Sequence, residues 1–208
     1  MNISIRPAKK EDVDCAIPLM FSAGPEAFRY VLSVTSQDQV LTFLHKAFIN
    51  GHGEFGYQSH WVACKGDEIV GLVGIRQAED NIDYMKSAIA NIFRFYSVFQ
   101  SFGVIYRGLK VEHIIKPPLK GTVCLHNLGV APKMQGSGIG KLLIGHVIAQ
   151  AMQRNIATVS LDVAETNPKA KALYLRFGFE AKAFNYGNLI GKFGRAVSHE
   201  YMEYQVAA

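Results

Sequence analysis

Cysteine is scarce in this chain of 208 residues, and its spacing matches no common metal site or disulfide framework. The three cysteines, Cys15, Cys64 and Cys124, lie far apart, and the sequence has no Cys-x-x-Cys motif and no Cys/His spacing typical of a metal site. No apolar run reaches the roughly 18 residues of a membrane-spanning helix. The sequence also lacks a dense run of Lys and Arg with interleaved aromatic residues. We therefore expect no metal, no membrane association and no nucleic-acid partner.

The overall composition is typical of a globular protein, with 49% hydrophobic and 19% charged residues. The length predicts one domain over residues 1–208. The net charge of +5 is a modest excess that suits an anionic cofactor. No secretory signal precedes the strand-like residues 3–6, so the simplest expectation is a cytoplasmic protein.

A glycine-rich stretch between a predicted strand and a predicted helix is the most informative feature. Residues 125–130 are an apolar strand end, Pro132 makes a turn, and an apolar helix pattern begins beyond Gly140. This order turns several backbone N–H groups toward one point, where the helix dipole adds positive potential. Glycine allows the positive φ values and close backbone approach that such a site needs. The predicted pyrophosphate-binding residues are Gln135, Gly136, Ser137, Gly138, Ile139, Gly140 and Lys141.

The loop matches neither of the two commonest phosphate-binding motifs. No Gly-Lys-Ser/Thr closes it as in a P-loop, and its glycines are not spaced as in the Gly-x-Gly-x-x-Gly of dinucleotide folds. A tight strand-to-helix turn without a ligand is the alternative interpretation, because glycines often mark turns.

A second block downstream has its own signals. Residues 158–163 form a β-branched, apolar run typical of a strand. Asn167 then suits the N-cap of a short helix, with Pro168 at the first helical position and Gly178 at the end.

Together, the two blocks resemble the GNAT superfamily of N-acetyltransferases. The resemblance is firm over residues 120–187 and poor over residues 78–119. It implies an α/β fold with a mixed, mostly antiparallel sheet of about six to seven strands flanked by helices. It also implies an acyltransferase that uses acetyl-CoA as acyl donor and transfers the acetyl group directly to a primary amine. The matching motifs are Gln135-x-x-Gly138-x-Gly140 and Asn167-x-x-Ala170-x-x-Leu173-Tyr174-x-x-Phe177-Gly178-Phe179.

The resemblance also implies roles for residues around the thioester. Main-chain groups near Leu128 and Val130 bind the pantetheine arm, and Asn167 contacts that arm near the helix start. Tyr174 lies where the family places a tyrosine that approaches the CoA sulfur. Because a phenol has a pKa near 10, it stays protonated at neutral pH and can donate to a departing thiolate. The alternatives are a plain N-cap for Asn167 and a core ring for Tyr174.

His126 is the candidate base for the amine. A free alkyl amine is mostly protonated at neutral pH, whereas an imidazole with a pKa near 6.5 can accept a proton. Related enzymes can carry a second histidine two residues earlier, where this chain has Cys124, and that difference argues against a two-histidine relay. A hydrogen-bonded strand histidine without a role in proton transfer is the alternative.

Residues 80–115 depart most from the family pattern. Apolar residues from Ile82 to Phe99 follow i, i+3, i+4, i+7 spacing, which predicts a long amphipathic helix that Gly103 breaks. We therefore expect a helical insertion between the third and fourth strands of the sheet. Its apolar stripe would pack on the domain, wall the acceptor site or form a homodimer surface.

A different class of function is also consistent with the sequence. The chain would then be a non-catalytic acyl-CoA-binding module that acts through a protein partner. The pair His126 and Tyr174 argues against this, because a sensor needs no proton acceptor and donor beside the thioester. The sequence does not identify the amine, which is a peptide N-terminus, lysine, amino acid, polyamine or amino sugar.

Overall fold

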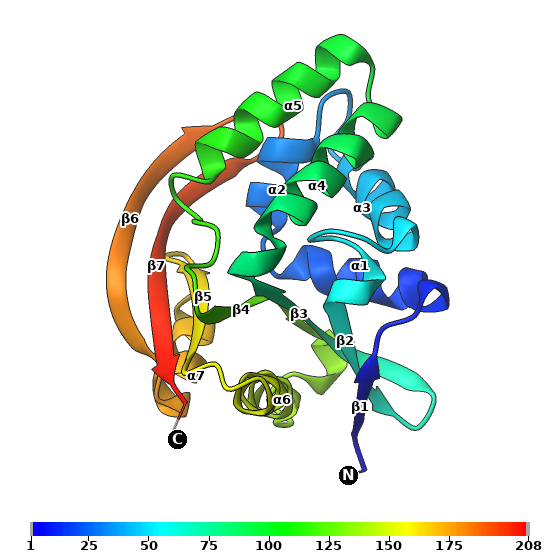
Figure 1. Ribbon diagram of the computed structural model, residues 1–208. Helices are drawn as coiled ribbons and strands as arrows, with labels where there is room; N and C mark the ends of the chain where they lie inside the picture. The colour runs from blue at the N-terminus through cyan, green and yellow to red at the C-terminus, as the bar shows by residue number, and fades with distance from the viewer. Residues whose placement is uncertain (1, 207–208) are drawn as a thin grey trace.

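A seven-stranded sheet organises the computed structural model, which describes residues 2–206 (Figure 1). The strands are β1 (Ser4–Pro7), β2 (His60–Lys65), β3 (Glu68–Gln77), β4 (Thr122–Val130), β5 (Thr158–Ala164), β6 (Glu180–Ile190) and β7 (Arg195–Gln205). Their spatial order is β1-β2-β3-β4-β5-β7-β6, and only β4 and β5 pair in parallel. The predicted mixed, mostly antiparallel sheet is confirmed.

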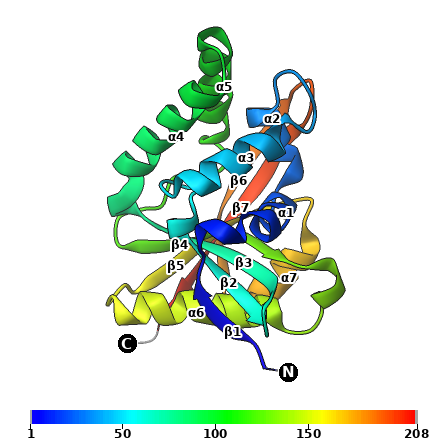
Figure 2. The same cartoon turned by 90° about the vertical axis from the view of Figure 1, so that its right-hand side faces the viewer.

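Helices cover both faces of this sheet (Figures 1 and 2). They are α1 (Val13–Ser22), α2 (Pro25–Leu32), α3 (Gln39–Asn50), α4 (Asn81–Phe95), α5 (Val98–Val111), α6 (Ile139–Gln153) and α7 (Pro168–Phe177). Because strand side chains alternate between faces, Val62 and Leu72 join a core with α1 and α3, whereas Val73 and Leu161 join a second core with α6 and α7.

The predicted helical insertion between the third and fourth strands is present as α4 and α5. The helix break lies at Tyr96 and Ser97, however, and the predicted break at Gly103 is wrong, since α5 runs through that residue. Ser97 caps α5 through a reciprocal box: its backbone N–H donates to Gln100 at 3.2 Å. Tyr96 is extended and buried, and its hydroxyl donates to the Leu32 carbonyl.

One side of the insertion is an apolar surface. The exposed residues recur at three- and four-residue intervals on each helix, and the rings of Phe93 and Phe102 join the two stripes at 6.0 Å. Of the aromatic residues in this segment, Tyr96 and Phe95 pack in the core against Phe43, whereas Phe99 is 91% exposed. The stripe comprises Ile82, Met85, Ile89, Phe93, Val98, Phe99, Phe102, Tyr106 and Leu109.

The parallel pairing of β4 with β5 is short. It covers three residue pairs and ends at Cys124 opposite Ser160. Beyond this point β4 continues to pair with β3 as far as Val130, and β5 continues to pair with β7 as far as Ala164. The facing edges of residues 125–130 and 161–164 therefore lack a strand partner in the described chain. We call this region the split.

Candidate active site

The glycine-rich loop lies between β4 and the start of α6. Gly136 and Gly138 have φ values of +80° and +89°, in the left-handed region that favours glycine. A Cβ at either position would have no atom within 4 Å, so the space above the loop is open. Gly138 is the N-cap of α6, and the free N–H groups of the first helical turn face this end. The loop thus has the backbone form of an anion-binding site.

Other residues of the predicted loop contribute to its shape. The side chain of Gln135 donates to the Val130 carbonyl at 3.4 Å, and the hydroxyl of Ser137 donates to the Met134 carbonyl. Ile139 is 1% exposed and packs in the core beneath the loop. These three side chains hold the turn, so the loop presents mainly its backbone groups to the open space above it.

Two further loop positions differ in what they offer. A Cβ at Gly140 would lie 3.3 Å from Leu173, so this glycine lets α6 approach α7 closely. Lys141 is exposed at the loop, whereas the neighbouring Lys133 is in an ion pair with Glu68. Lys141 is therefore the better placed of the two lysines for an anionic ligand.

The helix that carries Tyr174 begins as the sequence predicts. The side chain of Asn167 accepts from the backbone N–H of Ala170 at 3.1 Å, which confirms the N-cap. Gly178 ends the helix with a φ of +99°. Tyr174 is 7% exposed and packs against Phe179. Burial raises the pKa of Tyr174 well above its ordinary value, and the nearby Cys124 thiol raises it further, so the phenol keeps its proton at neutral pH.

His126 lies on β4, opposite Gly74 of β3. Its ring is edge-on to that of His60, with 5.4 Å between centroids. Both ring nitrogens are buried, and neither has a hydrogen-bond partner within residues 2–206. Burial, followed by the nearby His60 and Arg76, lowers the pKa of His126 well below 6.5. The ring is therefore neutral at physiological pH but is a weak base.

Asp162 is a titratable group that the sequence analysis missed. It lies on β5, two residues beyond Ser160, and the two-residue period places it on the same sheet face as Cys124 and His126. Its Oδ1 is buried and has no hydrogen-bond partner in the described chain. Burial raises the pKa of Asp162 to about 7, partly offset by Lys116. The available signal was a carboxylate within an otherwise apolar strand, since Asp is rarely buried without a reason.

The split therefore has titratable groups on both faces. Tyr174 belongs to the core of the α6 and α7 face. His126 and Asp162 lie on the other face, together with the thiol of Cys124, whose pKa burial raises to about 12. Side chains that are chemically able to accept and to donate a proton thus lie on opposite faces of the sheet at the split.

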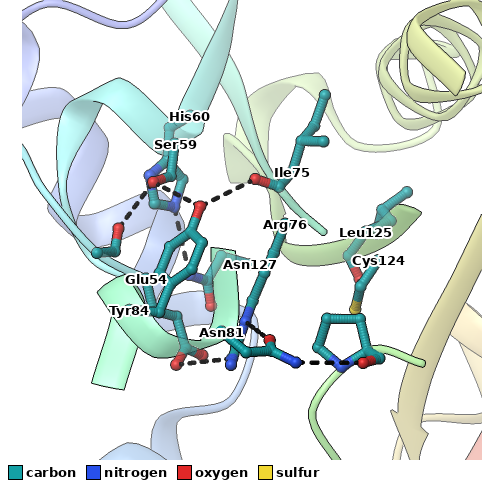
Figure 3. Close-up of polar contacts among 12 residues, drawn as sticks. Glu54, Ser59, His60, Ile75, Arg76, Asn81, Tyr84, Cys124, Leu125 and Asn127 are labelled. Carbon is teal, nitrogen blue, oxygen red and sulfur yellow. Dashed lines mark hydrogen bonds and ion pairs between the residues drawn. The ribbon is translucent and has the colours of Figure 1, made fainter. Parts of the chain in front are cut away.

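The first turn of the insertion reaches this site (Figure 3). Arg76, opposite Cys124 in the sheet, donates to Asn81 at 3.1 Å and lies over the ring of Tyr84 at 5.0 Å. Arg76 also lies 3.7 Å from the carboxylate of Glu54. The hydroxyl of Tyr84 donates to Ser59 at 2.9 Å. The insertion is thus bonded to the sheet beside the split.

The described residues contain no group of three metal-ligating side chains. Within residues 2–206, no helix combines the length and the apolar character needed to cross a membrane.

Comparison with known proteins gives the family. The sequence model of the acetyltransferase (GNAT) family matches residues 28–179, which is most of the chain. The chain belongs to the GNAT family. The [ribosomal protein bS18]-alanine N-acetyltransferase of Escherichia coli is 31% identical over 81 residues, 39% of this chain and 55% of that protein. N-acetyltransferase 8F1 of Rattus norvegicus is 24% identical over 162 residues, 78% of this chain and 54% of that protein. The chain thus spans about half the length of these relatives.

Solved structures agree on the fold of this GNAT protein. An N-acetyltransferase from Staphylococcus aureus has a TM-score of 0.72 at 16% identity, over 97% of this chain and 100% of that chain. A Bacillus subtilis acetyltransferase in complex with CoA has a TM-score of 0.56 at 16% identity, over 99% and 100% of the two chains. At these identities the likeness shows a shared fold.

Proposed function

We propose that this GNAT protein is an acetyl-CoA-dependent N-acetyltransferase that transfers the acetyl group directly to a primary amine. The observation that carries the proposal is the split, with an open glycine loop beside it and titratable groups on both of its faces. Acetyl-CoA supplies the thioester whose acetyl group moves. Its pyrophosphate would be held by the backbone of residues 135–140 with Lys141, and its pantetheine arm by the backbone near Leu128 and Val130 and by Asn167.

The proton acceptor in this proposal is Asp162 rather than His126. A general base works best with a pKa near the operating pH, and burial brings the pKa of Asp162 to about 7. The pKa of His126 is well below 6.5, so His126 accepts a proton less readily. Asp162 takes the proton of the amine as the nitrogen bonds to the acetyl carbonyl carbon. His126 supplies a neutral ring nitrogen beside the same position.

Tyr174 is the proposed proton donor. When the carbon–sulfur bond breaks, the phenol gives its proton to the leaving thiolate, and bulk solvent then restores it. A buried phenol with a raised pKa is protonated before the reaction, as this step requires. The proton lost by the amine and the proton gained by the sulfur thus pass through different residues.

The acceptor is selected, in this proposal, by the insertion and not by the CoA loop. Asn81 and Tyr84 connect the insertion to Arg76 beside the split. We therefore expect a change in α4 to alter the side of the site where the amine would enter. The relatives are named for different acceptors: alanine of ribosomal protein bS18 in one group and 5-NmdU in a phage enzyme. We infer a primary amine without choosing among these classes. The three free cysteines support the cytoplasm as the location.

A CoA-release screen tests the proposed function. The protein is incubated with acetyl-CoA and representatives of each amine class, free thiol is measured, and the product is weighed by mass spectrometry. We expect thiol release that depends on one amine class and a product heavier by one acetyl group. If the protein binds acetyl-CoA tightly but releases no CoA with any amine class, the result would support the non-catalytic module instead.

A further inference from the structure

Asn127 has an unusual backbone conformation at the centre of β4. Its φ is +51°, in the left-handed region that residues with a Cβ rarely adopt. Between the pairs Leu72–Gly129 and Gly74–His126, β3 has one intervening residue and β4 has two. This extra residue makes a β-bulge, which bends the strand and redirects its backbone groups. Such a conformation persists where surrounding contacts determine it.

The side chain of Asn127 is bonded to a buried histidine on β2 (Figure 3). Its amide nitrogen lies 3.3 Å from Nε2 of His60, and Nδ1 of His60 lies 2.8 Å from the carbonyl oxygen of Gly56. Because a carbonyl only accepts, Nδ1 carries the hydrogen, and Nε2 accepts from the Asn127 amide. His60 is 1% exposed, and burial lowers its pKa to about 4, so the neutral ring that this arrangement needs persists at neutral pH.

The far end of this hydrogen-bond chain is held by packing. A Cβ at Gly56 would overlap the backbone of Gly51, so the two loop segments touch directly. This packing holds the carbonyl of Gly56 in the position where it accepts the hydrogen bond from His60. These contacts connect a packed loop, through His60 of β2, to Asn127, which lies 67 positions after His60 in the sequence.

We propose that His60 and Asn127 are positioning residues that fix the β4 bulge and so direct the backbone of residues 127–130 toward the thioester. The inference rests on the proposed acetyl transfer. The β5 side of the bulge has no strand partner, because the β4–β5 ladder ends at Cys124. The side-chain bond from Asn127 takes the place of ladder bonds that elsewhere hold a strand in register. Without it, the bulge backbone is free to relax.

Asn127→Gly is the direct test, because glycine keeps the left-handed conformation accessible and removes only the amide. Asn155→Gly is the matched control: Asn155 also has a positive φ, +54°, but lies beyond the end of α6. We expect Asn127→Gly to lower kcat about 10- to 100-fold, as misplacement of a reacting group does. The Kd for CoA should rise by a smaller factor, because the backbone proposed to hold the pantetheine arm adjoins the bulge whereas the glycine loop is unchanged. Asn155→Gly should leave kcat unchanged.

A second variant and a spectroscopic readout guard against a general loss of structure. His60→Phe keeps a buried ring without its nitrogens, and the double variant should lose no more kcat than the more damaged single variant, because the two residues act as one unit. Nitrogen NMR of the histidine rings should show Nε2 of His60 shifting in Asn127→Gly but not in Asn155→Gly.

The outcomes separate this inference from the proposed function. Wild-type kcat in a folded Asn127→Gly variant, or fully additive losses in the double variant, would overturn the positioning role while acetyl transfer stands. If the wild-type protein releases no CoA with any of the amines tested, the proposed function and the positioning role both fail.

Discussion

The ring of His126 on β4 occupies the position that a Cβ at Gly74 of β3 would take, so residue 74 must be glycine for the ring to lie where it does. Gly74→Ala should therefore push the ring away from His60 and lower turnover about tenfold or more, since small displacements at a reacting centre have large effects. Steady-state kinetics and ring NMR measure the two effects. Gly145→Ala, at a helical position with no atom near the added methyl, is the control that should leave turnover unchanged.

Tyr174→Phe should lower kcat by about 10²–10⁴-fold, the range of general acid catalysis, with little change in CoA affinity. Only the hydroxyl is removed, and the ring still packs against Phe179. Tyr204→Phe is the matched control, because Tyr204 also contacts Phe179 but lies on β7. Full turnover in Tyr174→Phe, in a protein that binds CoA normally, would rule out the acid role.

Asp162→Asn should remove an inflection in the pH–rate profile. The carboxylate is the basic form, so the rate should rise as pH increases through the Asp162 pKa of about 7, and the Asn variant should lose that dependence with most of its turnover. Asp67→Asn, at an exposed turn, should keep the wild-type profile. An inflection that survives in Asp162→Asn but vanishes in His126→Gln would assign the base to His126.

The buried histidines predict sensitivity to mild acid. The pKa of His60 is lowered from 6.5 to about 4 in the folded protein, so the unfolded chain binds more protons between these values. The contribution of His60 to the free energy of unfolding should be fully present above pH 6.5 and should fall by about 3 kcal/mol as the pH decreases to 4. Urea denaturation at several pH values measures this, and His60→Phe should remove the His60 share of the dependence while the share of the buried His126 remains. His113→Gln, at an exposed position, should not.

Gly138→Asp should weaken CoA binding by adding a Cβ and a negative charge where the pyrophosphate is proposed to lie. Gly121→Asp separates this from backbone strain, because Gly121 has a similar φ of +77° and equally open surroundings, but precedes β4. Calorimetry with CoA should show at least a tenfold loss for Gly138→Asp alone, about 1.4 kcal/mol. Equal affinities in the two variants would contradict the phosphate-loop assignment.

Local patterns in the sequence predicted much of the fold. The strand run at 158–163, the cap at Asn167 and the stop at Gly178 each depend on neighbours a few residues away, and all are present. The break in the insertion was misplaced because the capping box of Ser97 and Gln100 outweighs the modest helix cost of Gly103.

Features that depend on distant contacts were not predictable. The bond between Asn127 and His60 joins β4 to β2, and the raised pKa of Asp162 arises from burial that only the assembled sheet provides. No local sequence pattern indicates the Asn127–His60 bond or the raised pKa of Asp162. The roles of His126, Tyr174 and the loop residues remain predictions for the experiments above.

The three residue pairs between β4 and β5 have a mechanical consequence. They are the only ladder in the described chain that joins strands β1 to β4 with strands β5 to β7. Besides this short ladder, the two parts of the sheet are joined by the core beneath α6 and by the packing of α2 on β7. We therefore expect the sheet to open and close slightly along the split. A ligand bound between strands β4 and β5 would hold the two parts of the sheet together. Part of its binding free energy would then stabilise the relative position of these two strands. The amide hydrogens of both β4 and β5 should then exchange more slowly when CoA is bound in the split.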